Sequence, residues 1–295
     1  MAKSKSFFGL RTGSTKTLTF QVNNGKQITK DRVEIVKNPR TQSQMVQRMI
    51  MATASAAYAA MREIANHSFE GTTYGQPCMS KFISINAKLL ANNLAVAGTQ
   101  FAYNKYQDRG LVPGAYQLAK GSLPKPSFTY SASSGEGSIS ITLNPTGLTS
   151  GYTANDLGAA LGLQVGEMAT ICMIFGNAAA NGWNFSFVRV KFLQSGNTAL
   201  TAANLADYFQ IESSLGEAAV TVNTTSLVLA YSDVDIADTS AIARCVIYSR
   251  NSANGWLRSD AIMTIPAGMV VAPTAADAIA TYPVGADYIL NGGNF

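Results

Sequence analysis

The residue types from which enzymes build active sites are scarce in this chain of 295 residues, which contains one histidine and three cysteines. His67, the single histidine, would have to serve any histidine-based triad or imidazole metal site alone. It lies at the expected C-terminal end of a helix, where a partial positive charge complements the helix dipole. We therefore assign no catalytic residue and predict that the protein is not an enzyme.

Two further stretches come close to known binding loops. Asp233, Asp235 and Asp238 form the nearest approach to a calcium loop, but they lack the glycine and the closing glutamate of an EF-hand. FFGLRTGSTKT, residues 7–17, resembles a phosphate loop, but its glycines are four residues apart and Lys16 follows the hydroxyl residues. We expect neither a metal nor a cofactor, and interpret the acidic stretch as a solvated loop.

Cys78, Cys172 and Cys245 are odd in number and widely spaced, which indicates reduced, mostly buried thiols without a disulfide framework. The basic N-terminus is not followed by the apolar segment of a signal peptide. No stretch approaches 18 consecutive apolar residues, so we expect no membrane partner.

Charge divides the chain into two halves. Residues 1–125 hold 17 Lys+Arg and 5 Asp+Glu, a net charge of +12, whereas residues 126–295 hold 5 and 12, a net charge of −7. The basic half could meet nucleic acid or another polyanion, it could meet the acidic half of a neighbouring subunit, or it could be a solvated face with no partner. The candidate polyanion contacts lie in the first 48 residues and are Lys3, Lys5, Arg11, Lys16, Lys26, Lys30, Arg32, Lys37, Arg40 and Arg48. No known base-reading motif accompanies them, so they would contact phosphates.

Charged residues make up only 13% of the chain, where about 25% is usual for soluble domains. A surface short of charge is poorly protected against self-association. We therefore expect much of this surface to be buried against copies of the same chain.

The N-terminal elements are expected to be a basic arm over 1–16, a hairpin turning at Asn24-Gly25, a short strand over 31–37 and a helix from Thr41 to about Asn66. Small and apolar side chains cover nearly every side of this helix, which indicates a central core helix or a helix packed against other subunits. Its candidate packing residues are Met45, Met49, Ala52, Ala56 and Ala60.

A second helix is expected from about Met79 to Ala97, followed by an irregular connection over 101–126. Beyond it the pattern is β, with alternating strands and short helical insertions at ANDLGAALG and TAANLADYFQ. Cys172-Met-Ile-Phe, followed after four residues by Ala-Asn-Gly-Trp183, recurs 73 residues later as Cys245-Val-Ile-Tyr and Ala-Asn-Gly-Trp256. This repeat predicts two similar β-sandwich modules in which Trp183 and Trp256 are buried anchors, with an exposed binding role as the alternative.

The predicted fold class is therefore α+β, with an N-terminal β-hairpin and long helices followed by two similar antiparallel β-sandwich-like modules. The predicted domains are a basic arm over 1–16, a hairpin and helical assembly domain over 17–125, and β-modules over 126–200 and 201–295.

The order of elements in residues 7–70, FFGLRTGS, NNGKQ, DRVEIV and then Asn38-Pro39-Arg40-Thr41-x-x-Gln44 opening an alanine-rich helix, resembles an uncharacterised protein family of Bacteroidota genomes and their gut phages. Members of that family likewise carry C-terminal β-modules. This chain differs in its longer central connection and its second helix. The resemblance implies a phage-associated protein with an assembly role, and it transfers no catalytic residue.

These observations favour a phage virion structural protein that self-assembles as a coat, tail or fibre component. It would be made in the host cytoplasm and located in the virion, with its own copies, other virion proteins or packaged nucleic acid as partners. The alternatives are a nucleic-acid-binding accessory protein that contacts phosphates through residues 1–48, and a β-sandwich adhesion or glycan-binding module with an exposed tryptophan platform.

Overall fold

The computed structural model describes residues 11–23, 25–32, 42–94, 111, 114–124, 129–133, 137–143, 147–177, 182–234, 236, 242–253 and 255–264. The chain divides into two compact units, residues 1–41 with 284–295 and residues 42–283. The hairpin lies in the first unit and the helices in the second. The predicted domain 17–125, which joined them, is therefore wrong.

The first unit contains a three-stranded antiparallel sheet of β1 (Gly13–Ser14), β2 (Leu18–Asn23) and β3 (Lys26–Asp31). The predicted hairpin is confirmed, because Asn23 pairs with Lys26 across a two-residue loop whose Gly25 has a φ of 74°. The prediction of an arm over residues 1–16 is partly wrong, since Gly13–Ser14 form β1, which pairs with β2. No described side chain of this sheet is buried.

The predicted helix over 41–66 is present as two helices, α1 (Gln42–Ala60) and α2 (Arg62–Ala65), which are separated at the buried Met61. Thr41 and the predicted strand 31–37 beyond Arg32 lie outside the described residues. The second helix, α3 (Gln76–Leu94), begins three residues earlier than predicted, because Pro77 is tolerated in the first turn of a helix. Its predicted end at Ala97 is also outside the described residues.

One side of α1 is buried and the other is exposed. Ile50, Ala54 and Ala57 are at most 1% exposed, whereas Met51 is 46% exposed and Ala52 and Ala60 are also exposed. The interpretation of α1 as a core helix surrounded by its own chain is therefore wrong. Packing of its outer side against another subunit stays a prediction.

The second unit is rich in antiparallel β-structure. Its five-stranded sheet has the order β13-β12-β7-β8-β9, formed by Gly255–Arg258, Ala243–Ser252, Met168–Asn177, Gly182–Phe192 and Phe209–Ser213. Its four-stranded sheet has the order β10-β11-β6-β5, formed by Ala219–Val222, Leu227–Tyr231, Ser138–Leu143 and Thr129–Ser133. A short pair joins β4 (Gln117–Ala119), inside the segment predicted to be irregular, to β14 (Ala261–Ile262).

The predicted division into β-modules 126–200 and 201–295 is wrong, because strands from both segments pair within the same two sheets. β6 pairs with β11, and β7 pairs with β12. The repeated motif therefore marks two hairpins, β7–β8 and β12–β13, whose first strands are neighbours. Cys172 and Cys245, the equivalent residues of the repeat, are directly opposite each other.

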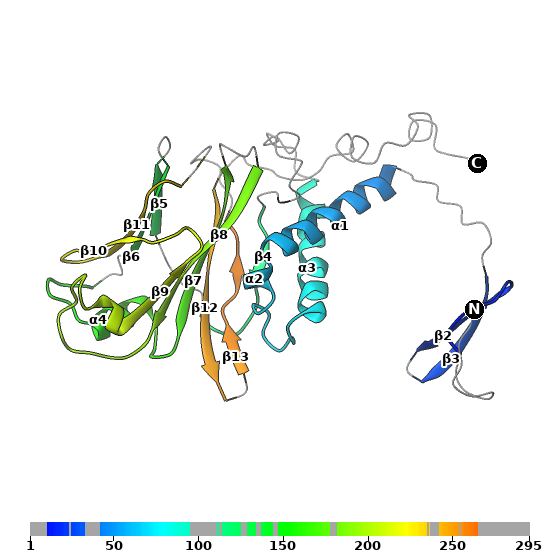
Figure 1. Ribbon diagram of the computed structural model, residues 1–295, viewed down its shortest axis with the longest axis horizontal. Coiled ribbons are helices and arrows are strands. Elements are labelled where there is room, and N and C mark those ends of the chain that lie inside the picture. Colours follow the sequence, from blue (N-terminus) through cyan, green and yellow to red (C-terminus); the bar gives the residue numbers. More distant parts are fainter. Residues whose placement is uncertain are drawn as a thin grey trace. The chain divides into compact units, whose positions relative to one another are not determined.

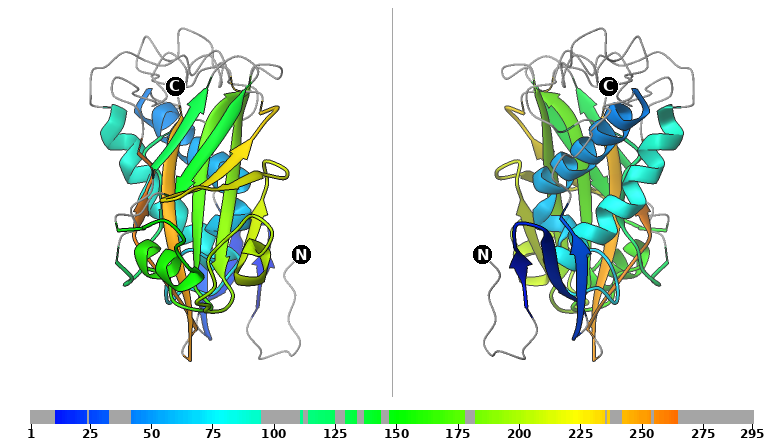
Figure 2. Two further views of the ribbon diagram at one scale, coloured as in Figure 1. Left: turned by 90° about the vertical axis from the view of Figure 1, so that its left-hand side faces the viewer. Right: turned by 90° about the vertical axis from the view of Figure 1, so that its right-hand side faces the viewer.

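The five-stranded sheet lies between the helices and the four-stranded sheet (Figure 1). On one side its Cys172, Ile174 and Phe187 share a core with α1, α2 and α3. On the other side Ile171 and Val190 share a second core with strands β6 and β11. Figure 2 shows α1 and α3 crossing in front of the sheet in its right-hand view.

The two predicted helical insertions are confirmed as α4 (Ala154–Leu161) and the short α5 (Leu205–Tyr208). Thr153 begins α4 with a capping box, in which its hydroxyl accepts from the Asp156 amide while the Asp156 carboxylate accepts from the Thr153 amide. Among the helices of the described residues, none combines the length and the apolar character that crossing a membrane requires.

All three cysteines are buried and free, as predicted. Burial raises the pKa of the Cys172 thiol well above its usual value, and a hydrogen bond with Cys245 raises it further. The Cys172 thiol therefore stays protonated at neutral pH, and both side chains pack as small apolar groups in the helix-facing core.

Ile141→Ala tests whether both cores unfold as one unit. Ile141 is fully buried in the second core, and its truncation should lower the free energy of unfolding by about 2–5 kcal/mol. In a Trp256→Phe background, fluorescence reports only Trp183, which is in the first core. The Trp183 transition should shift together with far-UV circular dichroism, and Val165→Ala, at an exposed position, should shift neither. An unchanged Trp183 midpoint in Ile141→Ala would show that the two cores are independent.

Candidate functional site

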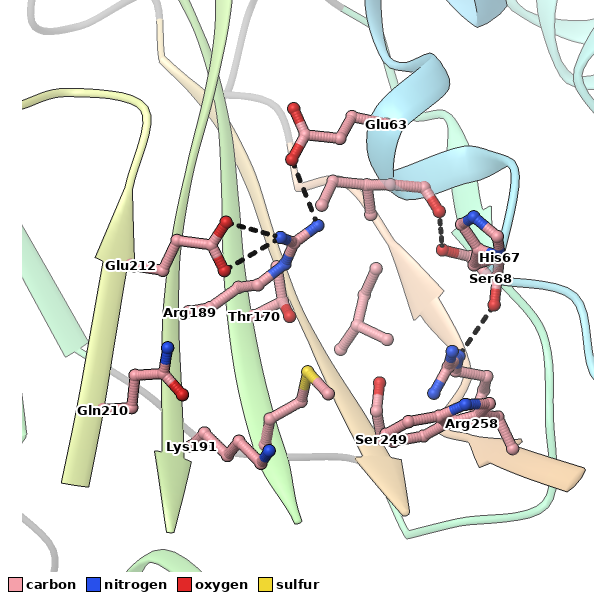
Figure 3. Close-up of a pocket in the computed structure, with 14 residues that line it drawn as sticks. Glu63, His67, Ser68, Thr170, Arg189, Lys191, Gln210, Glu212, Ser249 and Arg258 are labelled. Atoms are coloured by element: carbon pink, nitrogen blue, oxygen red, sulfur yellow. Dashed lines mark hydrogen bonds and ion pairs between the residues drawn. The ribbon is translucent and has the colours of Figure 1, made fainter. Parts of the chain in front are cut away.

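A pocket of about 350 Å³ lies between α2 with the loop that follows it and the helix-facing side of the five-stranded sheet (Figure 3). The residues after α1 supply Glu63 and His67, and strands β7, β8, β9, β12 and β13 supply the opposite wall. The charged and aromatic residues of that wall are Arg189, Lys191, Glu212, Trp256 and Arg258.

The pocket exists because the helices cover only part of this side of the sheet. Along β8, Trp183 and Phe187 pack in the helix-facing core, and Arg189 and Lys191 follow on the same side at a spacing of two residues. Along β12, the buried Cys245 and Ile247 are followed in the same way by Ser249. Where the helix layer ends, the side chains therefore change from apolar to polar.

Arg189 connects the two walls of the pocket. Its Nη1 lies 3.1 Å from both carboxylate oxygens of Glu212 on β9, and its Nη2 lies 3.4 Å from Oε1 of Glu63 on α2. Its guanidinium also lies over the Phe187 ring, at 4.5 Å from the centroid. Both glutamates are more than half exposed, so each ion pair stabilises the fold by at most about 1 kcal/mol.

Arg258 is the most buried cation of the pocket, with 7% of its surface exposed. Its Nε donates to the His67 carbonyl at 2.8 Å, and its guanidinium lies 4.9 Å from the centroid of the Trp256 ring. Burial, followed by the neighbouring charge of Arg189, lowers the pKa of Arg258 to about 10, although Glu70 opposes this shift. The side chain therefore remains charged at neutral pH in a partly desolvated position.

The backbone of Arg258 is fixed by a junction of three segments. The Glu70 carboxylate accepts from the Arg258 amide at 3.2 Å and from the Ser122 amide at 2.9 Å, while the Arg258 carbonyl accepts from Leu123 at 2.8 Å. A Cβ at Gly121 would lie 2.2 Å from the Arg258 carbonyl oxygen, so only glycine allows this approach. The junction thus sets the position from which Arg258 enters the pocket.

His67 and Ser68 are adjacent in the pocket wall but do not form a nucleophile and base pair. The Ser68 hydroxyl donates to the Ile64 carbonyl at 2.5 Å, and the exposed His67 ring lies 6.1 Å from the Tyr74 ring. His67 lies two residues beyond the end of α2, close to its predicted position. It contributes its backbone carbonyl to Arg258.

The predicted polyanion contacts that belong to the described residues are not among the residues lining this pocket. Arg11, Lys16, Lys26, Lys30 and Arg32 are exposed residues of the first unit, and Arg48 is exposed on α1. Lys3, Lys5, Lys37 and Arg40 lie outside the described residues.

The predicted packing residues have different environments. Trp183 is 4% exposed, as expected of a buried anchor, but Trp256 is 41% exposed at the pocket, so the same prediction for Trp256 is wrong. The hairpin β12–β13 lies at the edge of the sheet, which leaves Trp256 without a covering strand. Ala52 and Ala60 are exposed and Ala56 is half-buried, whereas the side chains of Met45 and Met49 lie outside the described residues.

The acidic stretch forms no described metal site. Asp235 and Asp238 are outside the described residues, and Asp233 is exposed with a φ of 58°. Within the described part of the chain, no group of three His, Cys, Asp or Glu side chains is placed to hold a metal ion.

Sequence reasoning did not single out Arg189, Lys191 or Arg258. Residues 126–295 contain only five Lys and Arg residues, and three of them line this pocket. The available signal was the run Phe185, Phe187, Arg189, Lys191 at alternate positions, which changes from apolar to basic within one strand.

Comparison of the chain with profiles of known protein families, with curated proteins and with solved structures finds no match.

Glu70→Gln tests the junction that holds Arg258. Although burial opposes the shift, hydrogen bonds from Ser122 and Arg258 lower the pKa of Glu70 below its ordinary value of 4.5. A carboxylate with a lowered pKa in the folded state stabilises the fold above the ordinary pKa, and this contribution is lost as the pH falls through the folded-state value. Wild type should therefore lose stability below about pH 4.5, and Glu70→Gln should lose about 1 kcal/mol at pH 7 but depend less on acid.

Denaturant titrations at several pH values measure both effects. Glu217→Gln is the control, because Glu217 is exposed and lies outside the junction. Equal acid dependence in Glu70→Gln and wild type would contradict the assigned role of Glu70.

Proposed function

We propose that this chain is a phage virion structural protein that self-assembles as a coat, tail or fibre component. The observation that carries the proposal is the outer side of α1. Ala52, Ala56 and Ala60 recur every four residues and so follow one line along the helix, beside Met51, which is 46% exposed. Among the described residues of the second unit, Ala52 and Ala60 are exposed and Ala56 is half-buried.

A line of alanines allows the backbone of another helix to approach closely, because each side chain ends at its Cβ atom. The neighbouring Met51 side chain is apolar and flexible, so it can fill an irregular contact surface. Charges that would oppose such a contact are absent from residues 49–61. We therefore propose that α1 packs through this stripe against a second copy of the chain.

The sheet of the first unit supports the same proposal. Leu18, Phe20 and Val22 lie on one side of β2, but all three are only half-buried. A small sheet needs an apolar side that is covered in order to be stable. On this proposal a neighbouring subunit provides that cover in the assembled particle.

The charges suggest which surface the first unit would meet. Its described residues 11–32 carry five Lys and Arg residues and one acidic residue, Asp31. Residues 126–295 carry a net charge of −7, so a neighbouring subunit offers a complementary surface. Packaged nucleic acid is the other polyanion that a virion protein of this charge would meet.

Ala52→Glu separates folding from assembly. Because Ala52 is exposed in the single chain, a glutamate there should change the free energy of unfolding by less than about 0.5 kcal/mol. In a contact between helices the same charge would be desolvated without a partner, so assembly should be lost. Light scattering and negative-stain imaging measure the particle size, and Gln47→Glu, on the polar end of the exposed side, serves as the control. Wild-type particles formed by Ala52→Glu would remove the basis for the proposal.

Nucleic-acid binding is a second candidate function, favoured by the arrangement of β3. Lys26, Ile28 and Lys30 point to the same side of this strand, opposite Asn23, Gln21 and Thr19 of β2, so the two ammonium groups lie on one polar surface. The expected result is binding to duplex DNA that weakens steeply with added salt, with a smaller salt slope in Lys26→Gln/Lys30→Gln. Fluorescence anisotropy at several salt concentrations measures this, with Lys88→Gln on α3 as the control. Binding that is insensitive to salt would exclude this candidate.

The adhesion alternative required an open aromatic platform. Trp256 is exposed, but the Arg258 guanidinium lies over its ring. The Trp256 ring is therefore not an open platform, and the charged pocket beside it is the better candidate for a binding site.

A further inference from the structure

We propose that the pocket between α2 and the five-stranded sheet binds a small organic anion, a carboxylate or a phosphate monoester, through Lys191 and Arg258. This inference goes beyond the proposed assembly function and does not depend on it.

The first observation that supports anion binding is the charge balance of the pocket. Three cations line it, Arg189, Lys191 and Arg258, together with the two carboxylates Glu63 and Glu212. Both carboxylates pair with Arg189. Within the described residues, no carboxylate lies within 4 Å of the charged nitrogens of Lys191 or Arg258, so the lining holds one positive charge in excess.

The second observation that supports anion binding is the burial of Arg258. A guanidinium that is largely removed from water is stable when anionic or several polar acceptors replace its hydration. Arg258 has two carbonyl acceptors among the described residues, His67 at 2.8 Å and its neighbour Leu257 at 3.4 Å. Arg250, which follows the Ser249 that pairs with Arg258, is paired with the buried carboxylate of Glu167 instead. Arg258 therefore retains donor capacity toward the pocket that an anion would satisfy.

The distribution of charge in the chain supports a built site. Residues 126–295 have a net charge of −7 and contain five Lys and Arg residues. Three of these five converge on one pocket from β8 and β13, which lie on opposite sides of the central strands β7 and β12. A solvated surface would have no reason to concentrate scarce cations in this way.

The size and the neutral lining indicate the class of ligand. A volume of about 350 Å³ is at the lower end of the range for small-molecule pockets and exceeds that of an inorganic ion. Gln210, Thr170 and Ser249 offer neutral hydrogen-bonding groups, and Met168 and Ile247 offer apolar contacts. This lining fits a molecule that combines one anionic group with a short polar and apolar body, on the scale of a monosaccharide acid or a sugar phosphate.

Titration with glucuronate, glucose 6-phosphate and glucose tests the proposal on the full-length chain. The three probes share one sugar ring and differ in bearing a carboxylate, a phosphate or no charge. Isothermal calorimetry measures affinity, and the fluorescence of Trp256 reports occupancy in a Trp183→Phe background. We expect at least one of the two anions to bind with a Kd below about 1 mM, and glucose to bind at least about 10-fold more weakly.

Lys191→Gln should weaken binding of the anion about 10-fold or more, because it removes one of the two cations that have no carboxylate partner among the described residues and disturbs no side-chain hydrogen bond of those residues. Lys191→Arg should restore much of the affinity, and Lys88→Gln, on α3, should leave it unchanged. The proposal is overturned if neither anion binds at concentrations up to about 10 mM, if glucose binds as well as the anions, or if Lys191→Gln binds like wild type.

Discussion

The structure of the second unit depends on the burial of the five-stranded sheet on both sides, and on β8 the two buried sides occupy different parts of the strand. On β8 the odd-numbered Trp183 and Phe187 pack in the helix-facing core, while the even-numbered Val188 and Val190 pack against the four-stranded sheet. The apolar side of the strand thus changes midway along it. Because the odd-numbered side is no longer covered after Phe187, Arg189 and Lys191 can be polar there, and the pocket follows from the way the two cores are offset.

Sequence reasoning predicted the local elements well, because their signals lie within a few residues. The hairpin at Asn24-Gly25 was predicted from turn chemistry, and the helix at ANDLGAALG was predicted as a short insertion between strands. The helix predicted over 41–66 matches α1 and α2 within the described residues, apart from the break at Met61. What the sequence could not supply was strand pairing across long separations, which is decided by which apolar surfaces fit together. The repeat around Cys172 and Cys245 satisfies the same local rules whether its copies form successive modules or neighbouring hairpins.

The pocket was missed for the same reason. Lys191 and Arg258 are 67 residues apart, and no spacing rule connects them. They lie in one pocket because β7 and β12 pair in the middle of the sheet, which places the two hairpins side by side. The change from phenylalanine to basic residues along β8 was visible in the sequence. This change could be interpreted as a pocket only once it was known that the helix layer covers the half of β8 that contains Phe185 and Phe187 and ends before the half that contains the basic residues.

The net charges of the basic and the acidic half are correct as sums over the sequence. They do not describe how charge is distributed over the surfaces of the folded chain. All five Lys and Arg residues of the acidic half are in the five-stranded sheet, on β8, β12 and β13. The negative charge of that half therefore arises outside these positions, and its central sheet has local positive sites. With only 13% charged residues in the chain, each cation has few carboxylates with which to pair. The position of a single unpaired cation such as Lys191 consequently says more about recognition than the net charge of the segment that contains it.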